Sequence, residues 1–197
     1  MGKYAERGRN PPHAIMPGDP PAIALIKKDH QVFRELFDRI EEKNGPEMVT
    51  LAGEACLRVT IHMILEEDVL YPALRPAIDL EKIDEGIVEH GQAKQLIIDI
   101  VHMTGREELY KSKVHVLGEE VMHHIDEEDR GLLRDARTAW EKGKIDLIEI
   151  GQLLGRRCQE LYDGISAMGR GGSQLEIEPV GEAIDEFAGA APPTGRG

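Results

Sequence analysis

The sequence predicts an all-α protein, an up-down-up-down four-helix bundle with an extra C-terminal helix and an extended tail. Aromatic residues make up only 4% of the 197 residues, so Val, Ile, Leu and Ala must fill the core, which suits packed helices. Apolar residues recur at spacings of three and four along five segments, without the alternation of a strand. Short links between these segments favour antiparallel neighbours.

The first two expected helices meet at a turn near residues 44–45. The first begins at Asp19, a capping acid followed by two prolines, and its apolar stripe is Ile23, Ile26, His30, Phe33, Phe37 and Ile40. The second begins at Pro46, and Pro72 and Pro76 are expected to kink or end it. Its stripe is Leu51, Ala55, Val59, His62, Glu66, Val69 and Ala73.

The next helices follow the same pattern. Asp79 is expected to cap the third, whose stripe is Ile83, Ile87, His90, Ala93 or Lys94, Ile97 and Val101. The fourth is expected from about Arg106 to Trp140, with the stripe Val114, Leu117, Val121, His124, Glu128 and then Gly131 or Leu132. The chain is thereby divided into an N-terminal arm (1–18), the bundle (19–141), an additional amphipathic helix (144–168) and a Gly/Pro/Ala-rich tail (169–197).

Composition narrows the classes of partner. Acidic residues outnumber basic ones 37 to 24, a net charge of −13 that repels phosphate backbones and anionic lipids. Neither nucleic acid nor membrane is therefore expected as a partner, and no apolar run reaches the length of a membrane span. The polar N-terminus and two cysteines outside any C-x-x-C pair favour the cytoplasm. A homo-oligomer is left open.

A histidine occupies the middle of every bundle stripe, and two helices add a glutamate one turn later. If neighbouring helices are antiparallel, residues at similar distances in sequence before and after a turn lie at the same level of the bundle. Counted in this way, these residues fall at similar levels. We therefore expect one shared layer made of His30, His62, Glu66, His90, His124 and Glu128. A single inward histidine is usually a hydrogen-bonded core residue. Six polar side chains are different, because each one left unpaired costs about 1–3 kcal/mol against a total stability of about 5–15 kcal/mol.

Metal ions would relieve that cost by taking the imidazole nitrogens and carboxylate oxygens as ligands. Six such ligands exceed one tetrahedral zinc and lack the oxygen-only shell of calcium. They suit two first-row ions, such as iron or manganese, with Glu66 and Glu128 as bridges. A ferritin-like site would need Glu-x-x-His on two helices, and only one such motif occurs among the ligand helices, at Glu120 and His123.

The chain resembles the hemerythrin-like (HHE cation-binding) proteins over roughly residues 20–140. Four segments carry the resemblance, DHQVFRELFDRI around His30, HMILEEDVLYPAL from His62, EHGQAKQLI at His90 and HHIDEEDRGLL at His124. The last segment offers His123 with Glu127 or His124 with Glu128, and both the apolar stripe and alignment with the second helix favour the latter pair. The resemblance implies a non-haem di-iron centre with an oxide or hydroxide bridge, in which manganese or zinc can substitute.

Two departures separate the chain from the oxygen-carrying members of that family. Lys94 stands where carriers have a second histidine on the third helix, and Glu128 lies four residues after its histidine where carriers use an aspartate five residues on. These features resemble the bacterial and iron-sensing branches. They imply binding or sensing of O2, NO, peroxide or iron under stress. Two alternatives stay open, a peroxide- or NO-consuming oxidoreductase and a structural bundle that uses residues 145–197 to engage a partner.

The sequence also predicts the places of several residues outside the expected layer. Glu67 and Glu127 are expected to be solvated acids, with a supporting role at the metal as the alternative. Two roles stay open for Lys94, one turn from His90: it pairs with a carboxylate, or it narrows the open coordination position of the metal. Tyr71 is expected to pack at the kink, with a hydrogen bond to a metal-bound species as the alternative. The remaining assignments are a surface position for His102 and His115, the N-terminal arm for His13, and the core for Cys56.

Overall fold

The computed structural model describes residues 3–4 and 14–169, and within this part of the chain it is helical without strands. The elements are α1 (Pro21–Glu41), α2 (Gly45–Leu65), the π-helical turn η2 (Glu66–Leu70), α3 (Tyr71–Leu74), α4 (Leu80–Val101), α5 (Tyr110–Arg130), α6 (Leu132–Glu141) and α7 (Leu147–Gly169). The extended tail and most of the N-terminal arm, including His13, lie outside the described residues.

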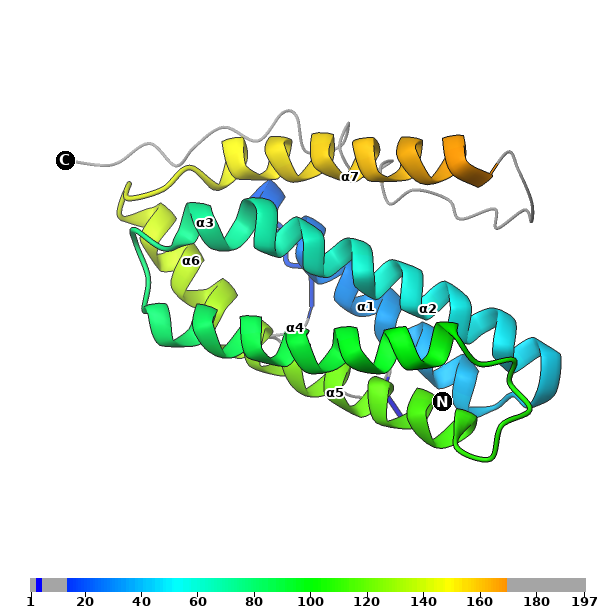
Figure 1. The fold of residues 1–197 in the computed structure, drawn as a ribbon. Coiled ribbons are helices and arrows are strands. Elements are labelled where there is room, and N and C mark those ends of the chain that lie inside the picture. The colour runs from blue at the N-terminus through cyan, green and yellow to red at the C-terminus, as the bar shows by residue number, and fades with distance from the viewer. Residues whose placement is uncertain (1–2, 5–13, 170–197) are drawn as a thin grey trace.

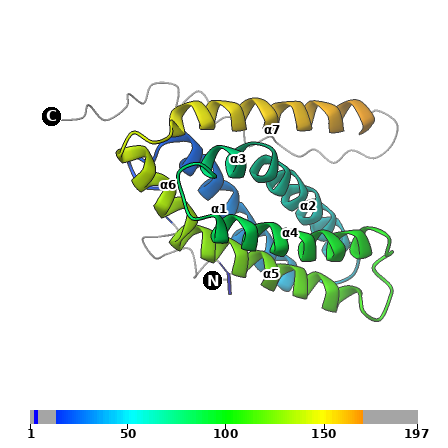
Figure 2. The same cartoon turned by 60° about the vertical axis from the view of Figure 1, so that its left-hand side comes forward.

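Helices α1, α2, α4 and α5 form an antiparallel four-helix bundle, as the hydrophobic pattern predicts. Around the bundle, α1 packs against α2, α2 against α4, α4 against α5, and α5 against α1. Helix α7 lies outside this ring along α1, with further contacts to α2 and η2 (Figures 1 and 2). At this contact Gly151 is required, because a Cβ there would lie 2.5 Å from Pro21 Cβ and 2.7 Å from Ala22 N.

Of the two aspartates expected to cap helices, Asp79 does so and Asp19 does not. Asp79 caps α4, since its Oδ1 accepts a hydrogen bond from the Glu81 amide at 3.1 Å. Asp19 does not cap α1, because Pro20 occupies the N-cap position and makes no side-chain capping bond. Asp19 is instead buried and pairs with Lys27 and Arg137, which ties the start of α1 to α6.

The apolar core consists of two clusters separated along the bundle axis. One fills the half nearer the α1–α2 and α4–α5 turns, with Phe33 and Phe37 of α1 among its largest side chains. The other lies toward α6 and α7 and includes Ile26, Leu65 and Leu132. On α1 and α4 the histidine expected in the polar layer lies in sequence between members of the two clusters, so apolar side chains cover the layer from both directions.

The π-helical turn changes which residues of the second helical segment face inward. The Tyr71 amide donates to the Glu66 carbonyl, an i→i+5 bond that adds one residue to the turn. Beyond Glu66 the buried residues are therefore Leu70, Tyr71 and Leu74, whereas Val69 and Ala73 are only half-buried. The expectation that Val69 and Ala73 continue the stripe is wrong for this reason. Pro72 lies inside the helical continuation, which ends at Leu74.

The fourth helix and the inward face of α4 also differ from the expectation. The fourth helix is not continuous from 106 to 140, because α5 begins at Tyr110 and the chain breaks direction at Gly131, whose φ is −112° and ψ −80°. On α4, Ile87 and Val101 are 40% and 57% exposed. The inward face of α4 runs instead through Ile83, Gly86, His90, Ala93, Ile97 and Ile100.

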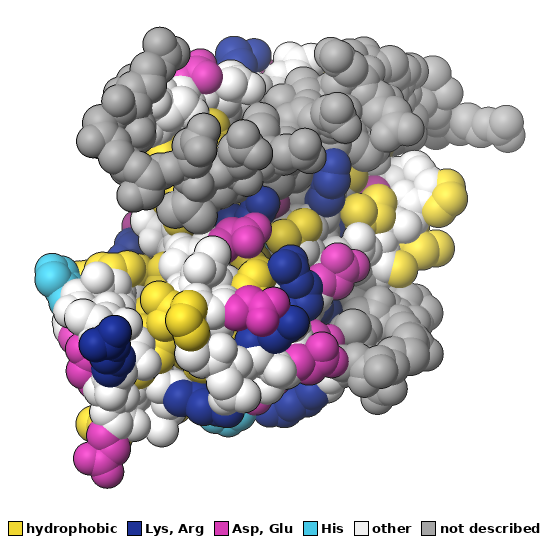
Figure 3. All heavy atoms as spheres, turned by 90° about the vertical axis from the view of Figure 1, so that its right-hand side faces the viewer, with side chains coloured by type: hydrophobic (Ala, Val, Ile, Leu, Met, Phe, Trp, Pro, Cys, Tyr) yellow, Lys and Arg dark blue, Asp and Glu magenta, His cyan; other side chains and the backbone are white. Residues whose placement is uncertain are grey.

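The continuous helical segment Gly45–Leu74 is 30 residues long and, by length and composition, apolar enough to cross a membrane, although no such run was expected. One such helix is weak evidence of a membrane span, because the core helix of a bundle has the same length and composition. Val59 of α2 lies in the core, and His62 and Glu66 are buried inside the bundle. On the end face with the α1–α2 and α4–α5 turns, acidic and basic side chains are interspersed (Figure 3).

Candidate metal centre

All six side chains expected in the polar layer lie close together inside the bundle. Each helix of the ring supplies one histidine, and η2 and α5 add the carboxylates. All six are buried, with exposed fractions of 7% or less, at His30, His62, Glu66, His90, His124 and Glu128. In α5 the alternative pair points outward, since the side chains of His123 and Glu127 are 61% and 54% exposed. Burial therefore favours the register that the apolar stripe predicts.

The six side chains form two groups that share Glu66. In one group, Glu66 Oε1 lies 3.2 Å from His62 Nε2, and His30 Nε2 lies 3.4 Å from Glu128 Oε2. In the other, Glu66 Oε2 lies 3.2 Å from His90 Nε2 and 3.8 Å from His124 Nε2. Glu128 Oε2 also lies 3.7 Å from His124 Nε2, so both carboxylates face both groups. This is the arrangement that two ions with bridging carboxylates require.

The donor atoms facing the middle of the layer fit a metal better than they fit one another. Both Glu66 oxygens, Glu128 Oε2, and Nε2 of His30 and of His62 are buried without a hydrogen-bond partner. Left so, each would cost about 1–3 kcal/mol, and a carboxylate more. Imidazole nitrogens and carboxylate oxygens are ligands of first-row metal ions, which would satisfy all five atoms together. The residues present therefore fit a pair of such ions.

The Nδ1 atom of each histidine in the layer pairs with a carboxylate from the preceding helical segment in the ring. Nδ1 of His62 pairs with Asp29 at 3.3 Å, and Nδ1 of His90 pairs with Glu67 at 2.8 Å. The remaining two pairs, with Nδ1–oxygen distances of 2.7 Å and 2.9 Å, are His124 with Glu89 and His30 with Asp129. The carboxylates thus run from α1 to α2, from η2 to α4, from α4 to α5 and from α5 back to α1. A carboxylate on Nδ1 fixes the tautomer and directs Nε2 to the metal.

The apolar stripes do not predict this outer set of acids. Glu67, expected to be a solvated acid, contacts both His90 and Lys94, whose Nζ lies 2.7 Å from Glu67 Oε2. Asp29, Glu89 and Asp129 lie outside the stripes and are not among the expected site residues. A signal was available, because each acid is the immediate sequence neighbour of a residue in the layer. Glu127 takes no part in the layer and pairs with His123 at 3.3 Å.

The layer attracts positive charge. Burial opposes ionisation of Glu66, but His62, His124 and His90 hold the pKa of this carboxyl well below its usual value. Burial also opposes ionisation of His124, which would lower its pKa. Glu128, Glu66 and Glu89 outweigh burial and raise the pKa of His124 to about 10. Buried carboxylates that stay ionised in this way stabilise cations, whether protons on imidazole or metal ions.

Tyr71 has a direct place in the layer, contrary to the expectation that it simply packs at a kink. Its hydroxyl donates to Glu128 Oε1 at 2.9 Å and lies 3.4 Å from His90 Nε2. Burial raises the pKa of this hydroxyl, as do the carboxylates of Glu128 and Glu66, so it remains a neutral proton donor. Gly86 makes room for it, because a Cβ there would lie 2.8 Å from the hydroxyl oxygen.

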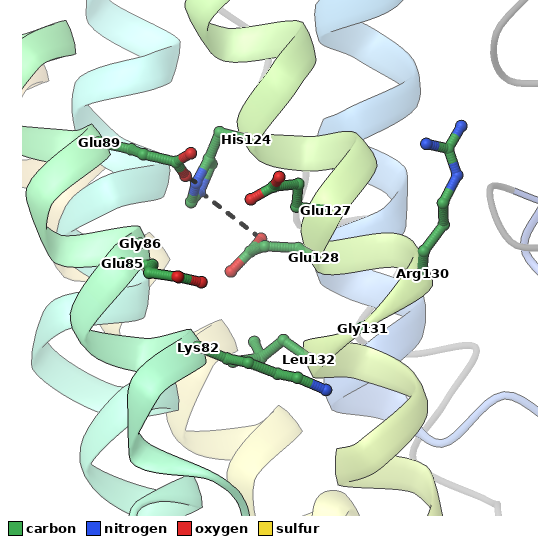
Figure 4. Close-up of a pocket in the computed structure, with 10 residues that line it drawn as sticks. All are labelled: Lys82, Glu85, Gly86, Glu89, His124, Glu127, Glu128, Arg130, Gly131 and Leu132. Carbon is green, nitrogen blue, oxygen red and sulfur yellow. Dashed lines mark hydrogen bonds and ion pairs between the residues drawn. The ribbon is translucent and has the colours of Figure 1, made fainter.

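A pocket of about 400 Å³ reaches the layer from the surface between α4 and α5 (Figure 4). His124 and Glu128 lie at its inner side, with Gly86 and Gly131 in its walls. A small molecule has a route to the layer here.

Three residues expected outside the layer lie where the sequence predicts them. His102 and His115 are exposed, and Cys56 is buried in the core.

Comparison with known proteins agrees with the class that the fold and layer define, a helical bundle with an internal cation site. The model of the hemerythrin HHE cation-binding domain matches residues 22–136. The uncharacterized protein Rv2633c of Mycobacterium tuberculosis is 26% identical over 142 residues, which cover 71% of this chain and 86% of that protein. A DNA nickase of Nostoc sp. is 27% identical over 115 residues, 58% of this chain but only 33% of the nickase.

A solved structure shows the same fold. The crystal structure of a hemerythrin HHE cation-binding domain-containing protein from Mycobacterium kansasii, an Rv2633c homolog, matches with a TM-score of 0.62 at 22% identity. The match covers 84% of this chain and 98% of that one. Because the family model spans more than half of the chain, the chain belongs to the hemerythrin HHE cation-binding family. This membership implies that it binds metal ions.

Proposed function

We propose that this chain is a non-haem di-iron protein that binds or senses a small diatomic or peroxide species in a cytoplasmic stress response. The observation that carries the proposal is the pair of donor groups joined by Glu66, each with two histidines. The six ligands are proposed to be His30, His62, Glu66, His90, His124 and Glu128. Manganese or zinc could substitute, because the ligand types do not distinguish these ions sharply.

Iron in this layer would supply redox chemistry and coordination positions that the protein leaves free. Six protein ligands are fewer than the twelve that two octahedral ions take, so O2, NO or peroxide could bind alongside an oxide or hydroxide bridge. The protein contributes the shape of the site. Apolar clusters on both sides exclude water, and the pocket beside Glu128 admits a molecule of this size.

The position of Tyr71 supports a second candidate, an oxidoreductase that consumes peroxide or NO. Its neutral hydroxyl, 2.9 Å from Glu128 Oε1, could deliver a proton inside the layer. Glu67, whose side chain is 30% exposed and contacts His90, could relay protons from solvent. In this candidate Tyr71→Phe should lower turnover while leaving the iron content unchanged.

Stopped-flow mixing of the diferrous protein with O2, NO and H2O2 distinguishes the candidates. A stable adduct with one of them, formed once per di-iron centre, is the expected result for a binding or sensing protein. Multiple turnovers would favour the oxidoreductase. The absence of any spectral response to all three would contradict both and favour a structural bundle that engages a partner through residues 145–197.

A further inference from the structure

A second cluster of possible metal ligands lies on the surface beside the buried layer. His123 Nε2 lies 3.3 Å from Glu127 Oε1 and 3.5 Å from Glu89 Oε1. One ligand atom from each of the three residues falls within 4.8 Å of the others. The His123 and Glu127 side chains are mostly exposed, and that of Glu89 is 21% exposed. The cluster is therefore open to solvent on its outer side.

Glu89 connects this cluster to the buried layer. Its Oε1 faces His123, whereas its Oε2 accepts a hydrogen bond from His124 Nδ1 at 2.7 Å. Glu89 and Glu127 also line the pocket that ends at Glu128. Figure 4 shows the Glu127 and Glu128 side chains reaching toward α4 from one side of this pocket. Glu128 Oε2 is buried there without a hydrogen-bond partner.

The surface that adjoins the pocket is strongly acidic. Beside the cluster lie three further carboxylates, at Glu81, Asp84 and Glu85. The two cations at the rim are engaged elsewhere, since Lys82 pairs with Asp135 and Arg130 contacts Asp126 and points away from the pocket (Figure 4). A cleft lined by one sign of charge concentrates counter-ions and raises their rate of arrival about tenfold or more.

We propose that Glu89, His123 and Glu127 form an entry site, where a divalent first-row metal ion binds before it passes to the buried centre. One imidazole and two carboxylates are suitable ligands for such an ion, and their exposure gives weak, reversible binding. The pocket then leads the ion to His124 and Glu128, the two members of the layer that line it. This inference rests on the proposed metal centre and adds the route by which it is filled.

Loading of the metal-free protein with Co²⁺ at low ionic strength tests the entry site, with the visible absorption of bound Co²⁺ followed in a stopped-flow instrument. The double variant His123→Ala/Glu127→Gln should load about tenfold more slowly than the parent and still reach two Co²⁺ per chain. His115→Ala is the matched control, because it also removes an exposed histidine paired with a carboxylate, Glu41, at a distance from the pocket. It should load at the parent rate. Added salt should slow the parent more than the double variant.

The possible outcomes separate the two levels of the proposal. A parent that reaches two Co²⁺ per chain, with a double variant that loads equally fast, overturns the entry site and leaves the buried centre standing. A double variant that loses Co²⁺ at equilibrium also overturns the entry site, because its residues would then belong to the centre itself. A parent that takes up no Co²⁺ overturns the buried centre and the entry site together.

Discussion

Glu66 joins the two halves of the polar layer, with one oxygen toward His62 and the other toward His90 and His124. Its backbone carbonyl also accepts the i→i+5 bond of the π-helical turn. In an α-helix, residues five apart would be separated by about 140° around the axis, so Tyr71 would point away from the layer. The π-turn places both residues on the same face. One local irregularity thus positions a proposed bridging ligand and the only tyrosine hydroxyl that contacts the layer within the described residues.

The adjacent histidines of α5 allow a direct test of the ligand register. His124→Ala should lower iron affinity roughly tenfold or more. Even the loss of a side chain that only hydrogen-bonds to a metal ligand lowers metal affinity 10- to 100-fold. His123→Ala should leave the iron content at equilibrium nearly unchanged, because its side chain is 61% exposed and outside the layer. Iron content and affinity are measured on both purified variants. The opposite result would show that the register read from the apolar stripe is wrong.

Gly86 offers a second test at the scale of a residue. Gly86→Ala should destabilise the metal-free protein by about 1–3 kcal/mol, because the new Cβ would lie 2.8 Å from the Tyr71 hydroxyl, which is buried and cannot move freely. Gly91→Ala on the same helix is the control. Nothing lies within 4 Å of its Cβ, so it should stabilise by about 1 kcal/mol through helix propensity. Urea unfolding gives both values.

Adding Tyr71→Phe to Gly86→Ala identifies the cause. The double variant lacks the oxygen that the Cβ would approach, so it should be less destabilised than the sum of the two single substitutions. Simple additivity of the two free-energy changes would contradict the close approach of Gly86 to Tyr71.

At the scale of elements, the four carboxylate–histidine pairs link the bundle helices into a closed ring. Each helix presents a histidine to the layer, and the acid that orients it comes from the neighbouring helix. The geometry of the layer therefore depends on the packing of helices and not on any one of them. Arg34 extends the ring, since its Nη2 donates to Asp129 at 3.2 Å and to Asp126 at 2.9 Å.

Asp129 and Asp126 form a matched pair for testing this ring. Asp129→Asn should lower metal affinity about 10- to 100-fold, because the amide is a weaker acceptor for His30 Nδ1 than the carboxylate. Asp126→Asn also weakens a contact with Arg34 but leaves the Asp129 carboxylate on His30 intact, so its metal affinity should stay near that of the parent. Equilibrium metal titration compares the two. Equal losses would assign the effect to Arg34 rather than to the histidine.

The sequence predicted the elements that follow a regular 3.6-residue period and failed where that period is interrupted. The four stripes identified the bundle and the inward position of all six layer residues. The shift from Val69 to Leu70 could not be read from the stripe, because a π-turn adds a residue without a marked change in composition. Likewise, Ile87 looked like a core residue, yet Gly86 faces inward because Tyr71 occupies that space. Such choices depend on contacts between helices.

At the scale of the whole molecule, the layer separates two apolar clusters and carries buried charge through the middle of the fold. Metal ions that neutralise this charge bind the folded state and therefore stabilise it. The bundle is accordingly expected to be considerably less stable without metal than with it. The stability of the bundle should therefore depend on metal occupancy, whichever first-row ion fills the site.

Removal of metal by a chelator should lower the unfolding temperature by roughly 10 °C, which corresponds to about 4 kcal/mol when the free metal exceeds its dissociation constant about 1,000-fold. Differential scanning calorimetry of the loaded and chelated protein measures the shift. The chelator should change His124→Ala much less, since that variant holds metal weakly. An equal unfolding temperature with and without metal in the parent would contradict the link between the layer and stability.

The central claim is that the layer holds two iron ions. Elemental analysis of protein purified without oxygen from iron-supplied cells tests it directly, together with circular dichroism to establish that the bundle is folded. The account predicts close to two irons per chain. A folded protein with iron near zero would contradict it.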